Sequence, residues 1–331
     1  MTGKVAASGG AGLRIVVVVL ALFVSQAPTS VDAQLDQNYY VGSCPNVENL
    51  VNQWLVANVF TDPTGPAALV RLVFHDCQVN GCDGSVLLDT QPGAVSELES
   101  DANFGIRDLR FIDSIKAAVE IACPGVVSCT DILALAARDC VRLTGGPNIR
   151  IPLGRKDGRS ASNLAADRQL PPSDISVPAF LNEFGQMGMT ADEAVAIIGA
   201  HTIGVGHCVN VVNRLFPQQD PALSPLMAGQ LLTQCPTPNA AFLNNNTILS
   251  NDFTNFVFDN QYYRDVMNGN GLFKIDSLIG QNPTTAGIVA RFAANQNDFF
   301  GVFSRAFVKM TSFRVLTGAQ GEVRRNCHRL N

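Results

Sequence analysis

The sequence has few charged residues, no excess of positive charge and no long apolar run. Charged residues account for 15% of the 331 positions and the formal net charge is −5, so the chain lacks the basic surface that binds nucleic acids or anionic membranes. No stretch of the sequence reaches the roughly 18 apolar residues of a membrane-spanning helix. Internal repeats, heptads and low-complexity tracts are also absent, which excludes solenoids and coiled coils. The 47% of hydrophobic residues is typical of a globular protein with a large core.

The first 33 residues have the layout of a secretory signal peptide. Lys4 and Arg14 supply positive charge, residues 15–24 form an unbroken apolar run, and small or polar residues follow up to Ala33. A membrane anchor is the alternative, but the run is short for a bilayer. We expect cleavage after Ala33, which leaves a mature chain of residues 34–331.

Nine cysteines all lie after this segment. Most cysteines of a secreted protein pair in an oxidising compartment, and an odd number leaves at least one thiol free or paired with another chain. The sequence alone does not choose among the many possible pairings. Asn245, Asn246 and Thr247 form one glycosylation sequon, which is consistent with a secreted protein.

Helical periodicity dominates the mature chain. A capping box over Thr190–Glu193 marks the clearest helix start, and Gly204 marks its expected end. Only residues 149–152 suggest a strand, so we predict a mainly α fold. The predicted helices cover residues 47–60, 66–77, 109–122, 129–143, 175–187, 190–204, 222–234, 259–268, 284–295 and 298–312. The two linkers rich in Gly, Pro, Ser, Asp and Asn, 85–105 and 146–174, are candidates for a functional loop or a bound ion.

Arg71 and His75 are four residues apart on a predicted helix and therefore share one face. A fixed positive charge disfavours protonation of a neighbouring imidazole, so the pair makes a poor salt bridge. The pair suits a site that needs a neutral base beside a cation. The cleavage of a peroxide O–O bond is a reaction that needs both groups. A surface arginine beside a structural histidine is the alternative.

His201 ends an otherwise apolar helical face and is a candidate iron ligand. A histidine in such a place is also commonly a hydrogen-bonded core residue. Ligation becomes attractive because His75 lies on a separate helix and can act on the other side of a haem plane. Asp276 is a candidate carboxylate partner for His201. The sequence has no Cys-x-x-Cys-His, so any haem is expected to be held non-covalently.

The loop that follows His75 carries hard oxygen ligands on a glycine-rich backbone. Asp76, Asp83 and Ser85 suit Ca²⁺, which accepts several oxygens in loose geometry. A short bridge between Cys77 and Cys82 is able to close this loop. The spacing does not match an EF-hand.

Together these motifs resemble those of the secretory plant peroxidases, the class that contains horseradish peroxidase. The segment Arg71–Cys77 with Val79–Asp83 is similar to their distal signature, and Gly199–Gly204 is similar to their proximal signature. The likeness runs from about Gln34 to Cys327. It implies a haem-peroxidase helical fold, in which a distal half (about 34–170) and a proximal half (about 171–331) sandwich haem b.

The resemblance implies a role for each matching residue. His75 is then the distal acid–base, Arg71 the transition-state stabiliser, Asn103 the residue that holds His75 in its basic tautomer, His201 the iron ligand and Asp276 its partner. Pro171 matches an aromatic-substrate site. Two calcium ions are also implied. The ligands of the distal ion are Asp76, Val79, Gly81, Asp83 and Ser85, with Glu97 in support. The ligands of the proximal ion are Thr202, Thr254, Val257 and Asp259. The implied disulfides are Cys44–Cys123, Cys77–Cys82, Cys129–Cys327 and Cys208–Cys235.

Several positions depart from the family pattern. Gln78 stands where the family usually has Phe. Asn251 occupies the place of an acid and Asp252 lies one step nearer to Thr254, so either the loop shifts and Asp252 becomes a ligand or that calcium binds more weakly. The segment 104–110 is one residue short. Cys140 has no family partner, and we expect a buried inert thiol rather than a redox sensor. We interpret His207 and His328 as structural or surface residues.

The resemblance implies a secreted, monomeric enzyme that reduces hydrogen peroxide and oxidises small phenolic donors by one-electron steps. Cell-wall metabolism, lignification and oxidative-stress responses are the expected settings, and the apoplast is favoured over the vacuole because only residues 328–331 follow the last cysteine. One alternative is a non-enzymatic protein that keeps the scaffold and binds a wall component or a receptor. Another is a peroxide-dependent haem protein with a narrow, non-phenolic donor.

Overall fold

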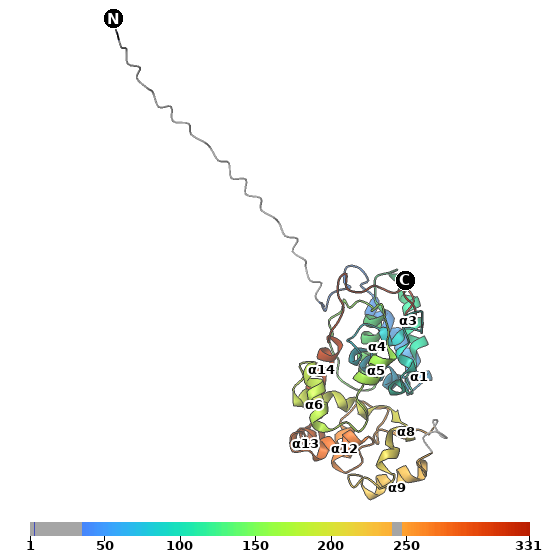
Figure 1. Ribbon diagram of the computed structural model, residues 1–331, viewed down its shortest axis with the longest axis vertical. Helices are drawn as coiled ribbons and strands as arrows, with labels where there is room; N and C mark the ends of the chain where they lie inside the picture. Colours follow the sequence, from blue (N-terminus) through green and yellow to red (C-terminus); the bar gives the residue numbers. More distant parts are fainter. Residues whose placement is uncertain (1–2, 4–34, 240–246) are drawn as a thin grey trace. The chain divides into compact units, whose positions relative to one another are not determined.

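The computed structural model describes residues 3, 35–239 and 247–331 (Figure 1). The expected signal peptide, and Asn245 of the sequon, lie outside the described residues. The described chain from residue 35 onward is mainly helical, as the sequence predicts. None of its helices is long and apolar enough to cross a membrane.

The first half of the chain forms five α-helices and three 3₁₀ turns among the described residues. They are α1 (Val47–Thr61), α2 (Gly65–Gln78), η1 (Ser85–Leu87), η2 (Glu97–Glu99), η3 (Asp101–Asn103), α3 (Leu109–Ala122), α4 (Cys129–Leu143) and α5 (Asn163–Gln169). Helix α4 is buried along nearly its whole length and packs against α1, α2 and α3. It is therefore the central helix of this half, and α2, which carries Arg71 and His75, is fixed against it.

The second half begins with α6 (Val177–Gln186) and ends with the long helix α14. Its other elements are α7 (Ala191–Ile198), η4 (Gly199–Thr202), β1 (Val205–Gly206), α8 (Cys208–Val211), η5 (Val212–Arg214), α9 (Pro225–Gln234), β2 (Leu249–Ser250), α11 (Gln261–Met267), α12 (Lys274–Gln281), α13 (Ala286–Ala294) and α14 (Gln296–Thr311). Helix α14 packs against α7 and α13 of its own half and against α2 of the first half. One hydrophobic core, which includes Val73, Leu135 and Phe303, therefore runs through both halves.

Four predicted details are wrong, and each has a local cause. Helix α7 ends at Ile198 and His201 lies on the tighter turn η4, so His201 does not continue the predicted helix. Helix α5 arises inside a linker because Ser162 caps it, its side chain accepting from the Ala165 N–H. Residues 149–152 form no strand, and Leu153 only bridges Asp36. The described strands, β1 and β2, pair antiparallel over two residues each, too short for a periodicity to reveal.

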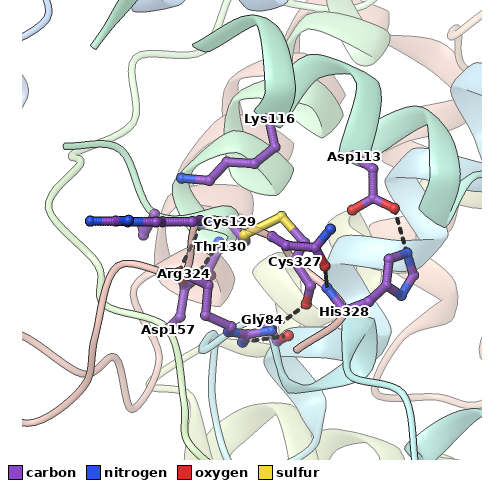
Figure 2. Close-up of a disulfide and its surroundings, with 12 residues drawn as sticks. Gly84, Asp113, Lys116, Cys129, Thr130, Asp157, Arg324, Cys327 and His328 are labelled. Carbon is purple, nitrogen blue, oxygen red and sulfur yellow. Dashed lines mark hydrogen bonds and ion pairs between the residues drawn. A yellow bond between two sulfur atoms is a disulfide. The ribbon is translucent and has the colours of Figure 1, made fainter. Parts of the chain in front are cut away.

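The four implied disulfides are all present, which confirms the predicted pairing. Cys129–Cys327 joins positions 198 residues apart and ties the C-terminal segment to the start of α4 (Figure 2). Beside it, the buried Asp157 carboxylate accepts from the backbone N–H groups of Cys129, Thr130 and Arg324. Cys140 is free and fully buried, and burial raises the pKa of its thiol, as expected for an inert cysteine.

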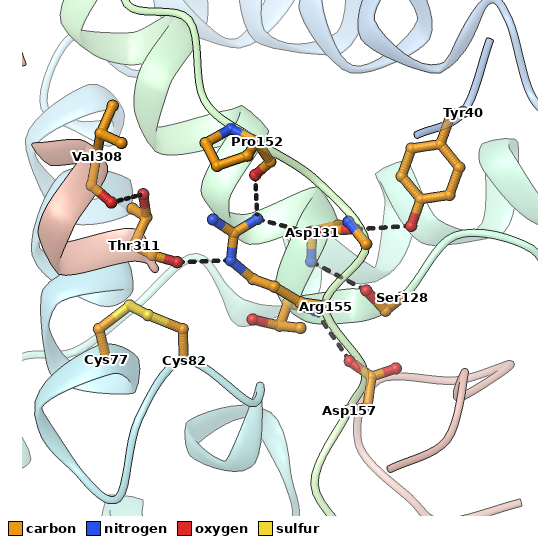
Figure 3. Close-up of polar contacts among 12 residues, drawn as sticks. Tyr40, Cys77, Cys82, Ser128, Asp131, Pro152, Arg155, Asp157, Val308 and Thr311 are labelled. Atoms are coloured by element: carbon orange, nitrogen blue, oxygen red, sulfur yellow. Dashed lines mark hydrogen bonds and ion pairs between the residues drawn. A yellow bond between two sulfur atoms is a disulfide. The ribbon is translucent and has the colours of Figure 1, made fainter. Parts of the chain in front are cut away.

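A buried ion pair fixes the loop that follows residue 151. The Arg155 Nη1 lies 2.7 Å from the Asp131 Oδ1, and both side chains are fully buried (Figure 3). Tyr40 donates to the other carboxylate oxygen of Asp131, and Arg155 Nε donates to the Thr311 carbonyl at the end of α14. The pair thereby joins α4, the 152–157 loop and α14, so loss of either partner leaves a buried charge that costs about 3–5 kcal/mol.

Candidate active site

His75 lies on the buried face of α2 with a hydrogen-bond partner on each ring nitrogen. Its Nδ1 is 2.6 Å from Asn103 Oδ1, and Arg71 Nε donates to its Nε2 over 3.1 Å. Because an arginine only donates, Nε2 is the acceptor and Nδ1 carries the proton. Burial, followed by the Arg71 charge, lowers the pKa of His75 to about 3. The imidazole is therefore a neutral base at ordinary pH.

Asn103 is held in the orientation that this tautomer needs. It ends the 3₁₀ turn η3, is buried, and its Nδ2 donates to the Glu97 carbonyl over 2.7 Å, which leaves Oδ1 facing His75. The one-residue shortening of the following segment thus leaves Asn103 beside His75. Arg71 also donates from Nη2 to the Phe104 carbonyl over 3.0 Å. Burial lowers the pKa of Arg71 to about 10, so its guanidinium remains charged at neutral pH.

His201 has the same arrangement with a carboxylate in place of the amide. Its Nδ1 is 2.9 Å from Asp276 Oδ1 on α12, which leaves Nε2 free. Asp276 is buried and accepts two further hydrogen bonds, from the Tyr262 hydroxyl over 2.8 Å and from the Phe273 N–H over 2.8 Å. Tyr262 was missed by sequence reasoning, because an aromatic residue inside a predicted amphipathic helix carries no signal of a polar contact.

The two histidine clusters belong to elements that touch each other. Gly204, three residues after His201, has φ of +100°, and a Cβ placed on it would lie 2.9 Å from the Cβ of Ala67. Ala67, Arg71 and His75 are spaced by four residues and share one face of α2. The segment that directly follows the turn of His201 therefore packs on the face of the helix that carries His75, and glycine is needed for this close approach.

The loop after His75 gathers carboxylates that lack protein partners. Asp76 Oδ1, Ser85 Oγ and both carboxylate oxygens of Glu97 are buried without a hydrogen bond among the described residues. Burial and then the neighbouring Asp83 raise the pKa of Asp76, and burial raises the pKa of Glu97 to about 8. Unpaired buried carboxylates are costly, so their chemistry fits a cation at this loop.

A second group of oxygens surrounds Thr202. Its hydroxyl lies 2.7 Å from Asp252 Oδ2 and 3.3 Å from Asp259 Oδ1, and the Thr254 hydroxyl lies 3.1 Å from the same Asp259 oxygen. Asp252, not Asn251, faces this group, while Asn251 donates to the Ile203 carbonyl. Burial is the main cause that raises the pKa of Asp252 to about 7. The carboxylate that contacts Thr202 is therefore that of Asp252.

Neither oxygen group forms a metal centre by side chains alone. In residues 35–239 and 247–331, no group of three or more His, Cys, Asp or Glu side chains is arranged to hold a metal ion. Both expected ligand sets include hydroxyl groups, and they also include the carbonyls of Val79, Gly81 and Val257. The two calcium sites accordingly stay predictions.

A family described as peroxidase matches residues 47–295. The chain is 44% identical to Peroxidase 29 of Arabidopsis thaliana over 99% of this chain and 98% of the relative. It is 40% identical to Peroxidase 28 of the same plant over 95% of this chain and 98% of the relative. It is 41% identical to Peroxidase 3 of that plant over 90% of this chain and 92% of the relative.

The chain belongs to the secretory plant peroxidase family. This peroxidase is an oxidoreductase that uses hydrogen peroxide and an electron donor. The predicted family and enzyme class are thereby confirmed, and the non-enzymatic alternative loses its basis. The roles of the individual site residues are not tested by these matches.

Two further positions singled out in the sequence, Pro171 and Gln78, make no side-chain hydrogen bond to His75 or His201. Pro171 is half-buried in the connection between α5 and α6, and its substrate role stays a prediction. Gln78, at the end of α2, is buried and donates to the Gln169 carbonyl over 3.0 Å and to Glu183 Oε1 over 2.5 Å. The polar residue at this position therefore ties α2 to the end of α5 and to α6.

The other two histidines have partners of their own. His207 Nδ1 bonds to the Thr247 carbonyl, and His328 Nε2 bonds to the Asp113 carboxylate.

Proposed function

We propose that this peroxidase holds haem b without covalent attachment, with His201 Nε2 as the iron ligand and His75 on the opposite face. The observation that carries the proposal is that each imidazole has its Nδ1 fixed by a side-chain oxygen, Asn103 for one and Asp276 for the other. The Nε2 of His201 then has no partner among the described residues, and the Nε2 of His75 is the unprotonated nitrogen, which faces Arg71. When bound, the haem iron supplies the electrons that the peroxide O–O bond takes up and later recovers them from the donor.

The chain's own residues move the proton and steady the charge. His75 Nε2 takes a proton from the oxygen of peroxide that stays behind and delivers it to the oxygen that leaves as water. Arg71 stabilises the negative charge that develops as the bond breaks. Asn103 keeps the proton of the resting imidazole on Nδ1, and Asp276 increases the basicity of His201 by accepting its Nδ1–H.

We further infer two calcium sites that support the two halves, about 34–170 and 171–331. The distal ligands are Asp76, Val79, Gly81, Asp83 and Ser85, with Glu97 in support, and the proximal ligands are Thr202, Asp252, Thr254, Val257 and Asp259. The unpaired oxygens of Asp76 and Glu97 support the first site. The convergence of Thr202, Asp252 and Asp259 supports the second.

Small phenols that donate one electron each near Pro171 are the proposed donors, because an electron can pass at the haem edge without the donor touching iron. The proposed location is extracellular, with residues 1–33 removed as a signal peptide, and the proposed state is a monomer. Cell-wall metabolism, lignification or oxidative-stress response is the proposed setting.

The visible spectrum of the secreted protein tests the proposal. We expect a Soret band for the isolated protein, a shift of that band on addition of peroxide, and its return when a phenol is added. A folded, disulfide-bonded preparation that takes up no haem contradicts the proposal. A Soret band that responds to peroxide but returns only with a non-phenolic donor supports the haem site and contradicts the phenolic donor class.

A further inference from the structure

Arg214 is a fully buried cation that the proposed mechanism leaves unused. It ends the 3₁₀ turn η5, which directly follows α8. Its Nε lies 2.9 Å from Asp220 Oδ2, so a carboxylate pairs with one edge of the guanidinium. The other two nitrogens donate to the segment 271–277, which carries Asp276 in the first turn of α12. The charge of Arg214 is therefore placed beside the residue that bonds to His201.

The guanidinium of Arg214 holds the chain on both sides of Asp276. Its Nη2 donates to Ser277 Oγ over 2.7 Å. A Cβ placed on Gly271 would lie 2.9 Å from the Cβ of Asp276, so the chain folds back tightly onto the first turn of α12 here. One side chain thus fixes the residues before and after Asp276. The Nη1 donates to three successive carbonyls over 2.5, 2.8 and 3.0 Å, those of Gly271, Leu272 and Phe273.

One peptide group connects Arg214 to Asp276. The peptide between Leu272 and Phe273 accepts from Arg214 Nη1 at its carbonyl over 2.8 Å. Its N–H donates to Asp276 Oδ2, also over 2.8 Å. Asp276 Oδ1 in turn lies 2.9 Å from His201 Nδ1. Hydrogen bonds in a chain polarise one another, so a cation at the carbonyl makes the N–H of the same peptide a stronger donor. A continuous chain of hydrogen bonds therefore runs from the guanidinium to the imidazole.

We propose that Arg214 is a positioning residue that also sets the strength of His201 as an iron ligand through this chain. The cation strengthens the bond from the Phe273 N–H to Asp276, which draws negative charge from the side of the carboxylate that faces His201. Asp276 then attracts the Nδ1 proton less strongly, and the imidazole becomes less basic. Because a less basic imidazole stabilises the ferric state less, Arg214 raises the reduction potential of the bound iron. Asp220 opposes this effect, since it neutralises part of the guanidinium charge.

The inference rests on the proposed role of His201 as the iron ligand. A side chain that only held the loop in place would have a different consequence when removed. Asp276 would then move away from His201, and the potential would rise, as expected for Asp276→Asn. Loss of the charge of Arg214 from the intact chain of hydrogen bonds lowers the potential instead. The sign of the change therefore separates the two roles.

Potentiometry on the haem-loaded wild type, Arg214→Gln, Arg214→Lys and Asp220→Asn tests the proposal. The first variant removes the charge and keeps an N–H donor, the second keeps the charge, and the third removes the opposing charge. Resonance Raman spectra of the ferrous proteins give the stretching frequency between iron and His201, which needs neither peroxide nor a donor. Urea unfolding measures the stability of each protein. Arg155→Lys, which changes a fully buried arginine of the 152–157 loop, is the control for destabilisation alone.

We expect Arg214→Gln to lower the ferrous-to-ferric ratio at a fixed electrode potential by up to about tenfold, or about 59 mV for a one-electron couple. The stretching frequency should rise, because the imidazole becomes a stronger ligand. Arg214→Lys should lie between this variant and the wild type. Asp220→Asn should shift both quantities in the opposite direction, and Arg155→Lys should leave both unchanged while it lowers the stability.

A potential that is unchanged or raised in folded Arg214→Gln overturns this inference alone, because the Soret band and the iron–histidine stretch still support the haem site. Where Arg214→Gln does not fold, Asp220→Asn decides, and an unchanged or lowered potential in that variant has the same meaning. A wild type that binds haem without an iron–histidine stretch overturns the proposed role of His201, and the inference with it.

Discussion

The two histidine clusters are built alike and differ in the group that accepts from Nδ1. His75 faces a neutral amide, that of Asn103, whereas His201 faces the carboxylate of Asp276. An amide fixes the tautomer without adding negative charge, so burial and Arg71 keep the imidazole of His75 deprotonated. A carboxylate adds charge and makes the imidazole a stronger ligand. In the proposed function, this exchange of one side-chain group suits His75 to proton transfer and His201 to metal ligation.

The largest expected effect comes from removing the base. His75→Leu should leave haem bound but slow the reaction with peroxide by about 10²–10⁴-fold, because no group then carries the proton between the two oxygens. Rapid mixing of the protein with peroxide, followed by the Soret absorbance, measures this step. His328→Leu, which removes a histidine of the C-terminal segment, is the matched control. A loss below about tenfold contradicts the assigned role.

Removing the Asp276 carboxylate beside His201 should affect haem binding more than proton transfer. Asp276→Asn makes the cluster of His201 resemble that of His75, and we expect about 10–100-fold weaker haem retention. A higher iron reduction potential should accompany it, because a less basic imidazole stabilises the ferric state less. Haem release to an acceptor protein and potentiometry measure the two effects. Asp139→Asn changes a buried carboxylate of α4 that bonds to Arg138, and it should alter neither.

The reverse exchange should create a pH dependence. Asn103→Asp introduces a negative charge beside His75 and raises the pKa of the imidazole from about 3. Since only the unprotonated imidazole accepts a proton from peroxide, the rate of the variant falls as the pH drops through the raised pKa. The wild-type rate should stay level down to about pH 4. Identical pH profiles for the two proteins contradict the expectation that a negative charge at residue 103 raises the pKa of His75.

The smallest expected effect concerns Tyr262. Tyr262→Phe removes one of the three hydrogen bonds to Asp276, which leaves that carboxylate a better acceptor for His201. The reduction potential should fall slightly, opposite in sign to the change in Asp276→Asn. Potentiometry detects it, and Tyr263→Phe, whose hydroxyl bonds to the Val195 carbonyl, is the control. A rise in potential shows that Tyr262 does not weaken the carboxylate.

Much of the fold follows from periodicity, since α1, α2, α3 and α4 begin and end within a residue or so of their predicted bounds. Apolar positions and caps define such helices locally. Helix α12 shows the limit of this reasoning. It carries Asp276 and has Ile275, Leu278 and Ile279 at helical spacing, but its eight residues are too few for this pattern to stand out in a longer window. The contact of Asp276 with His201, 75 positions earlier, exists only after the chain has folded.

The site was predictable in part and for different reasons. The spacing of Arg71 and His75 alone indicates a shared helix face, whereas Asn103 and every disulfide except Cys77–Cys82 came only from the family resemblance. That Asp252 rather than Asn251 contacts Thr202 needed the structure, because the two residues are adjacent in the sequence. The hydrogen bond between His207 Nδ1 and the Thr247 carbonyl joins positions 40 residues apart and likewise has no local signal.

The closure of the C-terminal segment has a consequence for biosynthesis. The start of α4 receives Cys327 as its disulfide partner, 198 positions later in the chain, and the Asp157 carboxylate that caps this helix also accepts from the backbone N–H of Arg324. The central helix of the first half therefore cannot be locked until residues 324–327 have been synthesised. Chains that stop before Cys327 should be retained by quality control rather than secreted.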